Sequence, residues 1–191
     1  MKNIAIFASG SGTNAENIIR YFTANKTVNV SVVLSDHKKV NVHERVNKLG
    51  IPSFAFTREE FTGGTPVINM LTEYKVDFIV LAGFMNKISH VLLTAFPHKI
   101  INIHPALLPK YGGKGMYGMH VHEAVVNAGE KESGITIHYI NEYYDEGKII
   151  FQATCPILPS DTPEDVATNV HALEYEHYPR IIERLLTENG R

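Results

Sequence analysis

The chain has 191 residues, of which 44% are hydrophobic and 20% are charged, with a formal net charge of −2 at pH 7. This length suits one globular domain with a three-layer core, so residues 1–191 are assigned to a single domain. The near balance of charges argues against nucleic-acid binding, no apolar run approaches the ~20 residues that span a bilayer, and the single cysteine, Cys155, excludes an internal disulfide.

Short apolar segments alternate with amphipathic segments, which predicts an α/β fold. The first apolar segment follows the N-terminus directly and is too short for the core of a signal peptide, so a cytoplasmic protein is expected. Strands are expected at 3–9, 28–35, 53–56, 77–82, 100–103, 135–140 and 149–154. Helices are expected between them at 14–22, 42–49, 65–73, 89–96 and 120–127.

The predicted architecture is a three-layer, doubly wound, mostly parallel sheet. Several strands are apolar on both faces, as buried parallel strands are, and right-handed crossovers put helices on both sides. The last two strands are joined by a turn and are expected to form an antiparallel edge. A long helix from Pro163 to about Leu186 follows, capped by Thr162 and Asp165, with Gly190 beyond its end. The longest irregular stretch, 105–119, is typical of a binding loop.

The first candidate site is the turn Ser9-Gly10-Ser11-Gly12-Thr13-Asn14, between a strand and a helix. Small residues let the backbone approach an anion, and a helix N-terminus offers free N–H groups, so the turn suits a phosphate. A tight turn that needs glycine only for its dihedral angles is one alternative. The other is the fingerprint of an NAD-binding oxidoreductase, made by Gly10, Gly12, Ala15 and Asp36.

The second candidate site is Asn102-Ile103-His104-Pro105, at the end of a strand. The carboxyl ends of strands form the ligand crevice of an open parallel sheet. Side-chain alternation puts Asn102 and His104 on one side, where an amide can stabilise an oxyanion and an imidazole can move protons. The alternative is a histidine that is hydrogen-bonded locally at a strand end.

The third candidate is Asp145, in the polar turn Glu142-Tyr143-Tyr144-Asp145-Glu146-Gly147. A carboxylate near His104 would hold the orientation of the imidazole and stabilise its protonated form. The alternative is an acid on a solvated turn. No metal site is expected, because His120, His122 and the other histidines lack an acidic or thiolate companion at ligand spacing.

The segment Asn102-Ile103-His104-Pro105-Ala106-Leu107-Leu108-Pro109-Lys110-Tyr111, with residues 9–14, 80–85, 134–138 and 174–179, carries a family resemblance. Over essentially the whole chain these residues resemble the folate-dependent phosphoribosylglycinamide formyltransferase family. The resemblance implies a formyltransferase-like, Rossmann-type fold. It also implies transfer of a formyl group from 10-formyltetrahydrofolate to the amine of glycinamide ribonucleotide in purine biosynthesis, with the folate as co-substrate and no permanently bound cofactor.

The resemblance further implies roles for individual residues. The catalytic residues are Asn102, His104 and Asp145. The ribonucleotide phosphate lies on Gly12, Thr13 and Asn14, and its amine is recognised by the segment His171, Ala172, Leu173 and Glu174, with Glu174 as the acid. The folate contacts Met85, Asn86, Lys87, Ile88, Asn102, Asn141, Glu142, Tyr143, Tyr144 and Asp145.

Three departures from the family pattern affect the folate side of the site. The family commonly has Met-Arg-Ile-Leu where this chain has Met85-Asn86-Lys87-Ile88. An arginine that the family uses for the folate tail falls on Gly63-Gly64, and the loop 112–119 is longer than is common. None of these departures touches the catalytic residues.

In the implied reaction an uncharged amine attacks the formyl carbonyl without a metal or covalent intermediate. Asn102 and protonated His104 stabilise the oxyanion, His104 carries the proton to the departing folate, and Asp145 maintains the charge of His104. Another folate-dependent formyltransferase or hydrolase is the near alternative, although these typically carry an additional domain. Small-molecule substrates are the expected partners, without nucleic acid or membrane, and the chain is expected to be a monomer or homodimer.

Overall fold

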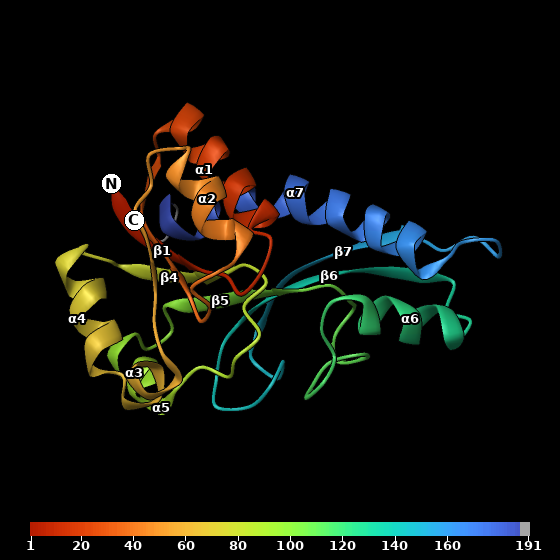
Figure 1. Cartoon of the computed structure of the whole chain (residues 1–191). Helices are drawn as coiled ribbons and strands as arrows, with labels where there is room; N and C mark the ends of the chain where they lie inside the picture. The colour runs from red at the N-terminus through yellow and green to blue at the C-terminus, as the bar shows by residue number, and fades with distance from the viewer. Residues whose placement is uncertain (188–191) are drawn as a thin grey trace.

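One seven-stranded sheet organises the computed structural model, which describes residues 1–187 (Figure 1). Its strands lie in the order β3-β2-β1-β4-β5-β6-β7. The first five strands in this order are parallel, whereas β6 runs antiparallel to both β5 and β7. The bounds are β1 (Lys2–Phe7), β2 (Val28–Ser35), β3 (Ser53–Ala55), β4 (Phe78–Leu81), β5 (Ile100–His104), β6 (Glu132–Tyr139) and β7 (Ile149–Pro156). The mostly parallel sheet and its antiparallel edge are therefore confirmed.

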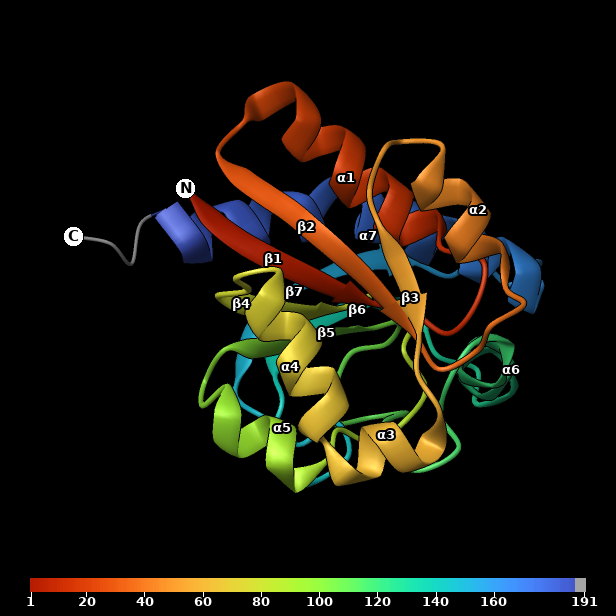
Figure 2. The same cartoon turned by 60° about the vertical axis from the view of Figure 1, so that its left-hand side comes forward.

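Helices cover both faces of the sheet, as the doubly wound prediction requires (Figure 2). One face carries α1 (Thr13–Asn25), α2 (Asn41–Asn47) and α7 (Pro163–Thr187). The opposite face carries α3 (Arg58–Gly63), α4 (Thr65–Glu73) and α5 (His90–Ala95). The remaining helix, α6 (Met119–Asn127), packs beside α7.

The predicted helices are confirmed with small differences in their ends, and one helix was not predicted. The missed helix is α3, whose signal is the capping box between Thr57 and Glu60. The expected capping box of α7 is present, since the Asp165 N–H donates to Thr162 Oγ1 and the Thr162 N–H to Asp165 Oδ2. Gly190 lies outside the described residues.

Two apolar clusters bury the two faces of the sheet. Along β1, Ile4 and Ile6 pack toward α1 and α7, whereas Ala5 and Phe7 pack toward the α4 and α5 side. Successive residues of a strand point to opposite faces, so a strand buried on both faces is apolar throughout. These clusters fix the sheet between its helical layers and bring the carboxyl ends of β1, β4 and β5 to one edge.

A proline inside α7 links that helix to α1. Pro179 has no N–H, so the carbonyl of Tyr175, four residues earlier, lacks its usual helical donor. The Asn17 side chain of α1 donates to this carbonyl at 2.9 Å. Tyr178, which directly precedes Pro179, is fully buried, and its hydroxyl donates to the Leu81 carbonyl at the end of β4, at 2.8 Å. These contacts hold α7 against the edge of the sheet where the site lies.

None of the helices described within residues 1–187 combines the length and the apolar character needed to cross a bilayer.

Candidate active site

A cavity of about 490 Å³ opens at the carboxyl ends of β1, β4 and β5. Its walls come from the turns after β1 and β4, the end of β5, two loops and one face of α7. Most of the residues predicted for the site line this cavity. They are Gly12, Thr13, Asn14, Met85, Asn86, Lys87, Ile88, Asn102, His104, Asn141, Tyr143, Tyr144, Asp145, His171 and Glu174.

Three residues predicted for the site lie outside the cavity wall. Helical periodicity puts His171 and Glu174 on one face of α7, so the intervening Ala172 and Leu173 face elsewhere. Ala172 is exposed, and Leu173 packs against the apolar core. Glu142 is exposed on its loop and is not part of the wall. The predicted contacts of these three side chains with ligands are therefore not supported by their positions.

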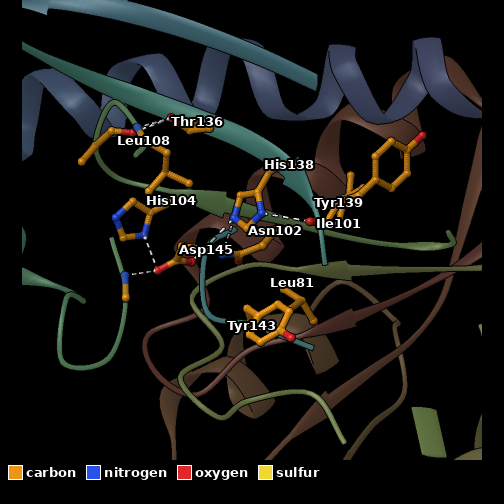
Figure 3. A network of polar contacts seen from close by, with 12 residues as sticks. Leu81, Ile101, Asn102, His104, Leu108, Thr136, His138, Tyr139, Tyr143 and Asp145 are labelled. Atoms are coloured by element: carbon orange, nitrogen blue, oxygen red, sulfur yellow. Dashed lines mark hydrogen bonds and ion pairs between the residues drawn. The ribbon is translucent and has the colours of Figure 1, made fainter. Parts of the chain in front are cut away.

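His104 and Asp145 lie together, although 41 positions separate them (Figure 3). His104 Nδ1 is 3.7 Å from Asp145 Oδ2, and the Asp145 side chain is only 13% exposed. The Gly113 N–H donates to Asp145 Oδ2 at 2.9 Å. The turn folds back tightly enough that a Cβ on Gly147 would collide with the Tyr139 carbonyl oxygen. Asp145 is thus a partly buried, partnered acid, and the solvated-turn alternative is wrong.

A backbone carbonyl, rather than Asp145, makes the direct hydrogen bond to the His104 ring. His104 Nε2 lies 2.7 Å from the Tyr111 carbonyl oxygen, which only accepts hydrogen bonds. At 3.7 Å, Asp145 is beyond hydrogen-bond distance and acts through its charge. The expectation that Asp145 holds the orientation of the imidazole is corrected in this respect, because Tyr111 provides that contact.

His138 is a site residue that the sequence reasoning missed. It lies on β6 directly opposite Asn102 of β5, and Asn102 Nδ2 is 3.4 Å from His138 Nε2. His138 Nε2 also lies 3.6 Å from Asp145 Oδ1. Burial lowers the pKa of His138, opposed by the hydrogen bond from its Nδ1 to the Tyr139 carbonyl and by the charge of Asp145. The neutral ring therefore accepts from Asn102 and orients its amide. The sequence signal was that residues 134–138 belong to the family resemblance, whereas the pairing of β6 with β5 came only from the structure.

The turn after β1 has the features expected of an anion site. Gly12 is the N-cap of α1, with a φ of 74° and no capping side chain, and the first N–H bonded within the helix is that of Glu16. A Cβ on Gly12 would lie 2.5 Å from the Val42 side chain, so both the backbone angle and the close approach require glycine. Arg45 donates to the Ser11 carbonyl at 3.0 Å. The turn is therefore held from outside by α2, and residues 10–14 line the cavity.

Asp36 does not occupy the position that the dinucleotide alternative needs. Its Oδ2 accepts from Asn86 Nδ2 at 2.6 Å, in the turn after β4. Asp36 is not part of the cavity wall, whereas a ribose-binding acid would face the ligand. The carboxylate is thus engaged by a neighbouring turn, which argues against an NAD-binding site.

Glu174 forms a buried polar cluster with residues of α1 and α7. It is 6% exposed, and its Oε2 accepts from Asn14 Nδ2 at 3.1 Å and lies 2.8 Å from His171 Nδ1. The hydrogen bond with Glu174 raises the pKa of His171. Asn14 Oδ1 is buried without a hydrogen-bond partner in the described structure. The cluster therefore presents an unused acceptor beside the turn after β1.

His122 links this cluster electrostatically to His104. It is 2% exposed, its ring centroid is 6.3 Å from that of His171, and its Nδ1 has no partner among the described residues. Burial lowers the pKa of His122 to about 4, with further contributions from the charges of His171 and His104. His122 is therefore neutral near pH 7.

The positions of the side chains do not favour a metal site or a catalytic thiol in the described part of the chain. Across residues 1–187, no three His, Cys, Asp or Glu side chains are grouped as metal ligands. The absence of a metal remains a prediction. Cys155 lies on β7 outside the cavity wall, and burial raises the pKa of its thiol. This residue is therefore structural in character.

Comparison with known proteins identifies relatives over nearly the whole chain. Residues 2–182 match the family described as Formyl transferase. The chain is 40% identical to the chloroplastic phosphoribosylglycinamide formyltransferase of Arabidopsis thaliana over 98% of its length. It is 38% identical to the phosphoribosylglycinamide formyltransferase of Bacillus subtilis, covering 100% of this chain and 98% of the relative. The chain spans 66% of the length of the Arabidopsis relative. It spans 62% of the length of the chloroplastic phosphoribosylglycinamide formyltransferase of Vigna unguiculata.

Solved structures show the same fold. The phosphoribosylglycinamide formyltransferase of Bacillus halodurans superposes with a TM-score of 0.89 at 38% identity, covering 98% of this chain and 97% of that chain. The glycinamide ribonucleotide transformylase 1 of Symbiobacterium toebii also gives a TM-score of 0.89, at 33% identity over 100% of this chain and 89% of that chain.

The buried His122 predicts a loss of stability in mild acid. Between its ordinary pKa of 6.5 and about 4, the unfolded chain binds a proton at this position and the folded chain does not. The free energy of unfolding should therefore fall as the pH falls through this window, by about 3 kcal/mol in total from this residue. Urea unfolding of wild type and His122→Gln at pH 7.5, 6 and 4.5 measures the effect.

The matched control is His120→Gln, because His120 lies on the same helix with its side chain 64% exposed. His120→Gln should keep the wild-type dependence of stability on pH, whereas His122→Gln should flatten it. Equal slopes for wild type and His122→Gln would contradict the assignment of His122 as a buried neutral histidine.

Proposed function

We propose, from the premise that this chain belongs to the formyl transferase family, that it transfers a formyl group from 10-formyltetrahydrofolate to the amine of glycinamide ribonucleotide in purine biosynthesis. The observation that carries the proposal is the meeting of Asn102, His104 and Asp145 in one cavity with the open N-terminus of α1. The names of the relatives that this chain matches over most of their length support it.

The chemistry assigned to the site needs an oxyanion donor and a proton carrier. The amine nitrogen bonds to the formyl carbon, and the bond from that carbon to folate N10 breaks. Asn102, whose amide is oriented by His138, donates to the oxygen of the tetrahedral intermediate, and His104 adds its positive charge. One proton leaves the amine nitrogen and one reaches N10, both through His104, so N10 departs as a neutral amine. Asp145 Oδ2 lies 3.7 Å from His104 Nδ1, where its negative charge attracts the positive charge that the ring carries during the transfer.

The ribonucleotide is placed with its phosphate on the N–H groups of residues 12–14. This placement uses the helix N-terminus and the close backbone approach at Gly12. Asn14 and Glu174 are in direct contact, which argues against their binding opposite ends of one substrate, the roles that the family resemblance implied. We therefore assign the amine to the surroundings of Asn102 and His104. Glu174 then accepts from the ribose hydroxyls beside the phosphate.

The folate is placed against the mouth of the cavity formed by the turns after β4 and β6. Met85 and Tyr143 are 54% and 57% exposed there, so flat apolar surface is available for a pterin. The Lys87 ammonium lies 5.7 Å from the centroid of the Tyr144 ring and joins the two turns. The side chain of Asn86 is already bonded to Asp36, which leaves its backbone for the ligand. Folate enters as a co-substrate, with no permanently bound cofactor.

The wider setting of the enzyme is part of the same proposal. One sheet, with most of the predicted site residues gathered in a single cavity at its edge, supports the assignment of residues 1–191 to a single formyltransferase domain. Its partners are small-molecule substrates rather than nucleic acid or membrane, and it works as a monomer or homodimer. A cytoplasmic location is proposed for this chain, while the plant relatives bear chloroplastic names.

A direct assay distinguishes this function from its near alternative. Purified protein is mixed with 10-formyltetrahydrofolate with and without glycinamide ribonucleotide, and loss of the formyl group is followed by folate absorbance. The formyl group should be lost only when the ribonucleotide is present, and formylated ribonucleotide should accumulate in equal amount. Release of formate at the same rate without the ribonucleotide would indicate a hydrolase instead.

The contact between His104 and Asp145 predicts non-additive losses of activity. His104→Ala should lower kcat by about 10²–10⁴-fold, because the proton carrier is lost. Asp145→Asn should lower kcat less, because it removes the charge at nearly constant shape. The double variant should be little worse than His104→Ala, since the two residues act as one unit. Steady-state kinetics of the four proteins measures this coupling, and multiplicative losses would show that the residues act independently.

Glu174 should affect binding of the ribonucleotide more than binding of the folate. Glu174→Gln removes the charge that accepts from Asn14 and His171, and the affinity for the ribonucleotide should fall by about tenfold. Calorimetric titration with each ligand separately measures the two affinities. Glu176→Gln is the control, because Glu176 is an exposed acid of the same helix. Equal losses for both ligands would instead indicate a general structural role.

A further inference from the structure

Tyr111 contacts the catalytic histidine through its backbone, although its own side chain points elsewhere. His104 Nε2 donates to the Tyr111 carbonyl at 2.7 Å, so this nitrogen carries a proton in both the neutral and the charged ring. Nδ1 is the nitrogen that faces Asp145. The carbonyl therefore decides which nitrogen of the neutral ring is free to take up a proton.

The backbone of Tyr111 adopts a conformation that has to be held in place. Its φ is 55°, in the left-handed region that side-chain-bearing residues rarely adopt. On the side away from His104, the Tyr111 hydroxyl donates to Glu130 Oε1 at 2.9 Å, and Lys110 Nζ binds the same oxygen at 2.8 Å. The residue is thus tethered on both sides, by its carbonyl to His104 and by its hydroxyl to Glu130.

The hydrogen bonds that Tyr111 and Lys110 make to Glu130 involve charged groups and lie outside the active-site cavity. Hydrogen bonds from Lys110 and Tyr111 lower the pKa of Glu130, so the acceptor is ionised near neutral pH. Burial, together with Glu130, raises the pKa of the Tyr111 phenol, which therefore keeps the proton that it donates. These three residues line a separate, smaller cavity of about 270 Å³. A function in substrate contact is thus not needed to explain them.

A second set of bonds fixes the segment between His104 and Tyr111. Thr136 of β6 accepts from the Leu108 N–H at 3.0 Å (Figure 3). Its hydroxyl donates to the Ala106 carbonyl at 2.7 Å. Gln152 of β7 donates to the Leu108 carbonyl at 3.0 Å. With the start of the segment fixed by β6 and β7, the bond to Glu130 sets its far end, where the Tyr111 carbonyl lies.

We infer that Tyr111, tethered by Glu130, is a positioning residue that keeps the proton of neutral His104 on Nε2 and so makes Nδ1 the nitrogen that carries the proton in formyl transfer. The inference about the reaction rests on the proposed function, whereas the position of the proton on the ring does not. Among residues 1–187, three ionisable groups lie near His104, namely Asp145 on the Nδ1 side, and His138 and His122 at longer range. None of these provides a hydrogen-bond acceptor for Nε2, so the carbonyl sets the tautomer.

The tautomer can be measured without substrate. In protein labelled with ¹⁵N in its histidine rings, long-range ¹H–¹⁵N spectra at pH 8.5 distinguish protonated from unprotonated ring nitrogens, and His104→Ala identifies the His104 signals. Nε2 of His104 should be protonated and Nδ1 unprotonated. A ring protonated mainly on Nδ1 would overturn the inference whatever reaction the protein catalyses.

The tether is tested with Tyr111→Phe, which removes only the hydroxyl. Part of the His104 population should shift to the Nδ1-protonated form, and kcat should fall about fivefold with both KM values unchanged, as expected for loss of one hydrogen bond. Glu130→Gln keeps an acceptor oxygen and should retain at least half of the wild-type kcat. Tyr21→Phe is the matched control, because it breaks a tyrosine–glutamate hydrogen bond to Glu183, far from the cavity.

The outcomes separate positioning from stability and from the proposed function. Wild-type tautomer and kcat in Tyr111→Phe, or equal losses of kcat in Tyr111→Phe and Tyr21→Phe, would overturn the positioning role. If the wild-type protein transfers no formyl group, the proposed function fails. The spectra of wild type and Tyr111→Phe still decide whether Tyr111 controls the ring.

Discussion

The antiparallel pairing of β6 with β5 is the constraint on which the site depends. In this register Asn102 lies opposite His138 and His104 lies opposite Thr136. His138 orients the amide of Asn102, while Thr136 binds the segment that leads from His104 to Tyr111. The loop that leaves β6 then returns Asp145 to both histidines. A parallel β6 would keep the same residues but place them at other heights along β5, and these contacts would be lost.

Glu174, which is buried, and Asp145, which is partly buried, follow the same physical rule in the cavity wall. An ionised carboxylate is costly to bury unless donors and opposite charge surround it. Asp145 receives the Gly113 N–H and is flanked by two histidines, whereas Glu174 receives Asn14 and lies beside His171. Within residues 1–187, neither acid has a lysine or arginine as its partner. Each is therefore paired with a ring whose charge depends on pH, which suits a site that must gain and lose protons during turnover.

Helix α7 lies on one face of the sheet and supplies residues to the cavity wall. The break in its hydrogen bonding at Pro179 releases the Tyr175 carbonyl to Asn17, while Tyr178 reaches the end of β4. Both contacts lie within about one turn of Glu174, so the helix that supplies the acid is also attached to α1 and to the sheet. The Asn14–Glu174 bond across the cavity therefore joins two elements that are already fixed with respect to each other.

The strands, most of the helices and part of the site follow from the sequence alone. Local periodicity determines which segments form strands, and alternation along one strand puts Asn102 and His104 on a common side. The glycine-rich turn at the start of α1 is likewise a local signal. Contacts between distant segments depend instead on strand order and direction, which periodicity does not encode. The tertiary structure alone therefore decided that His138 joins the site, that the Tyr111 carbonyl rather than Asp145 bonds the His104 ring, and that Glu174 meets Asn14 across 160 positions.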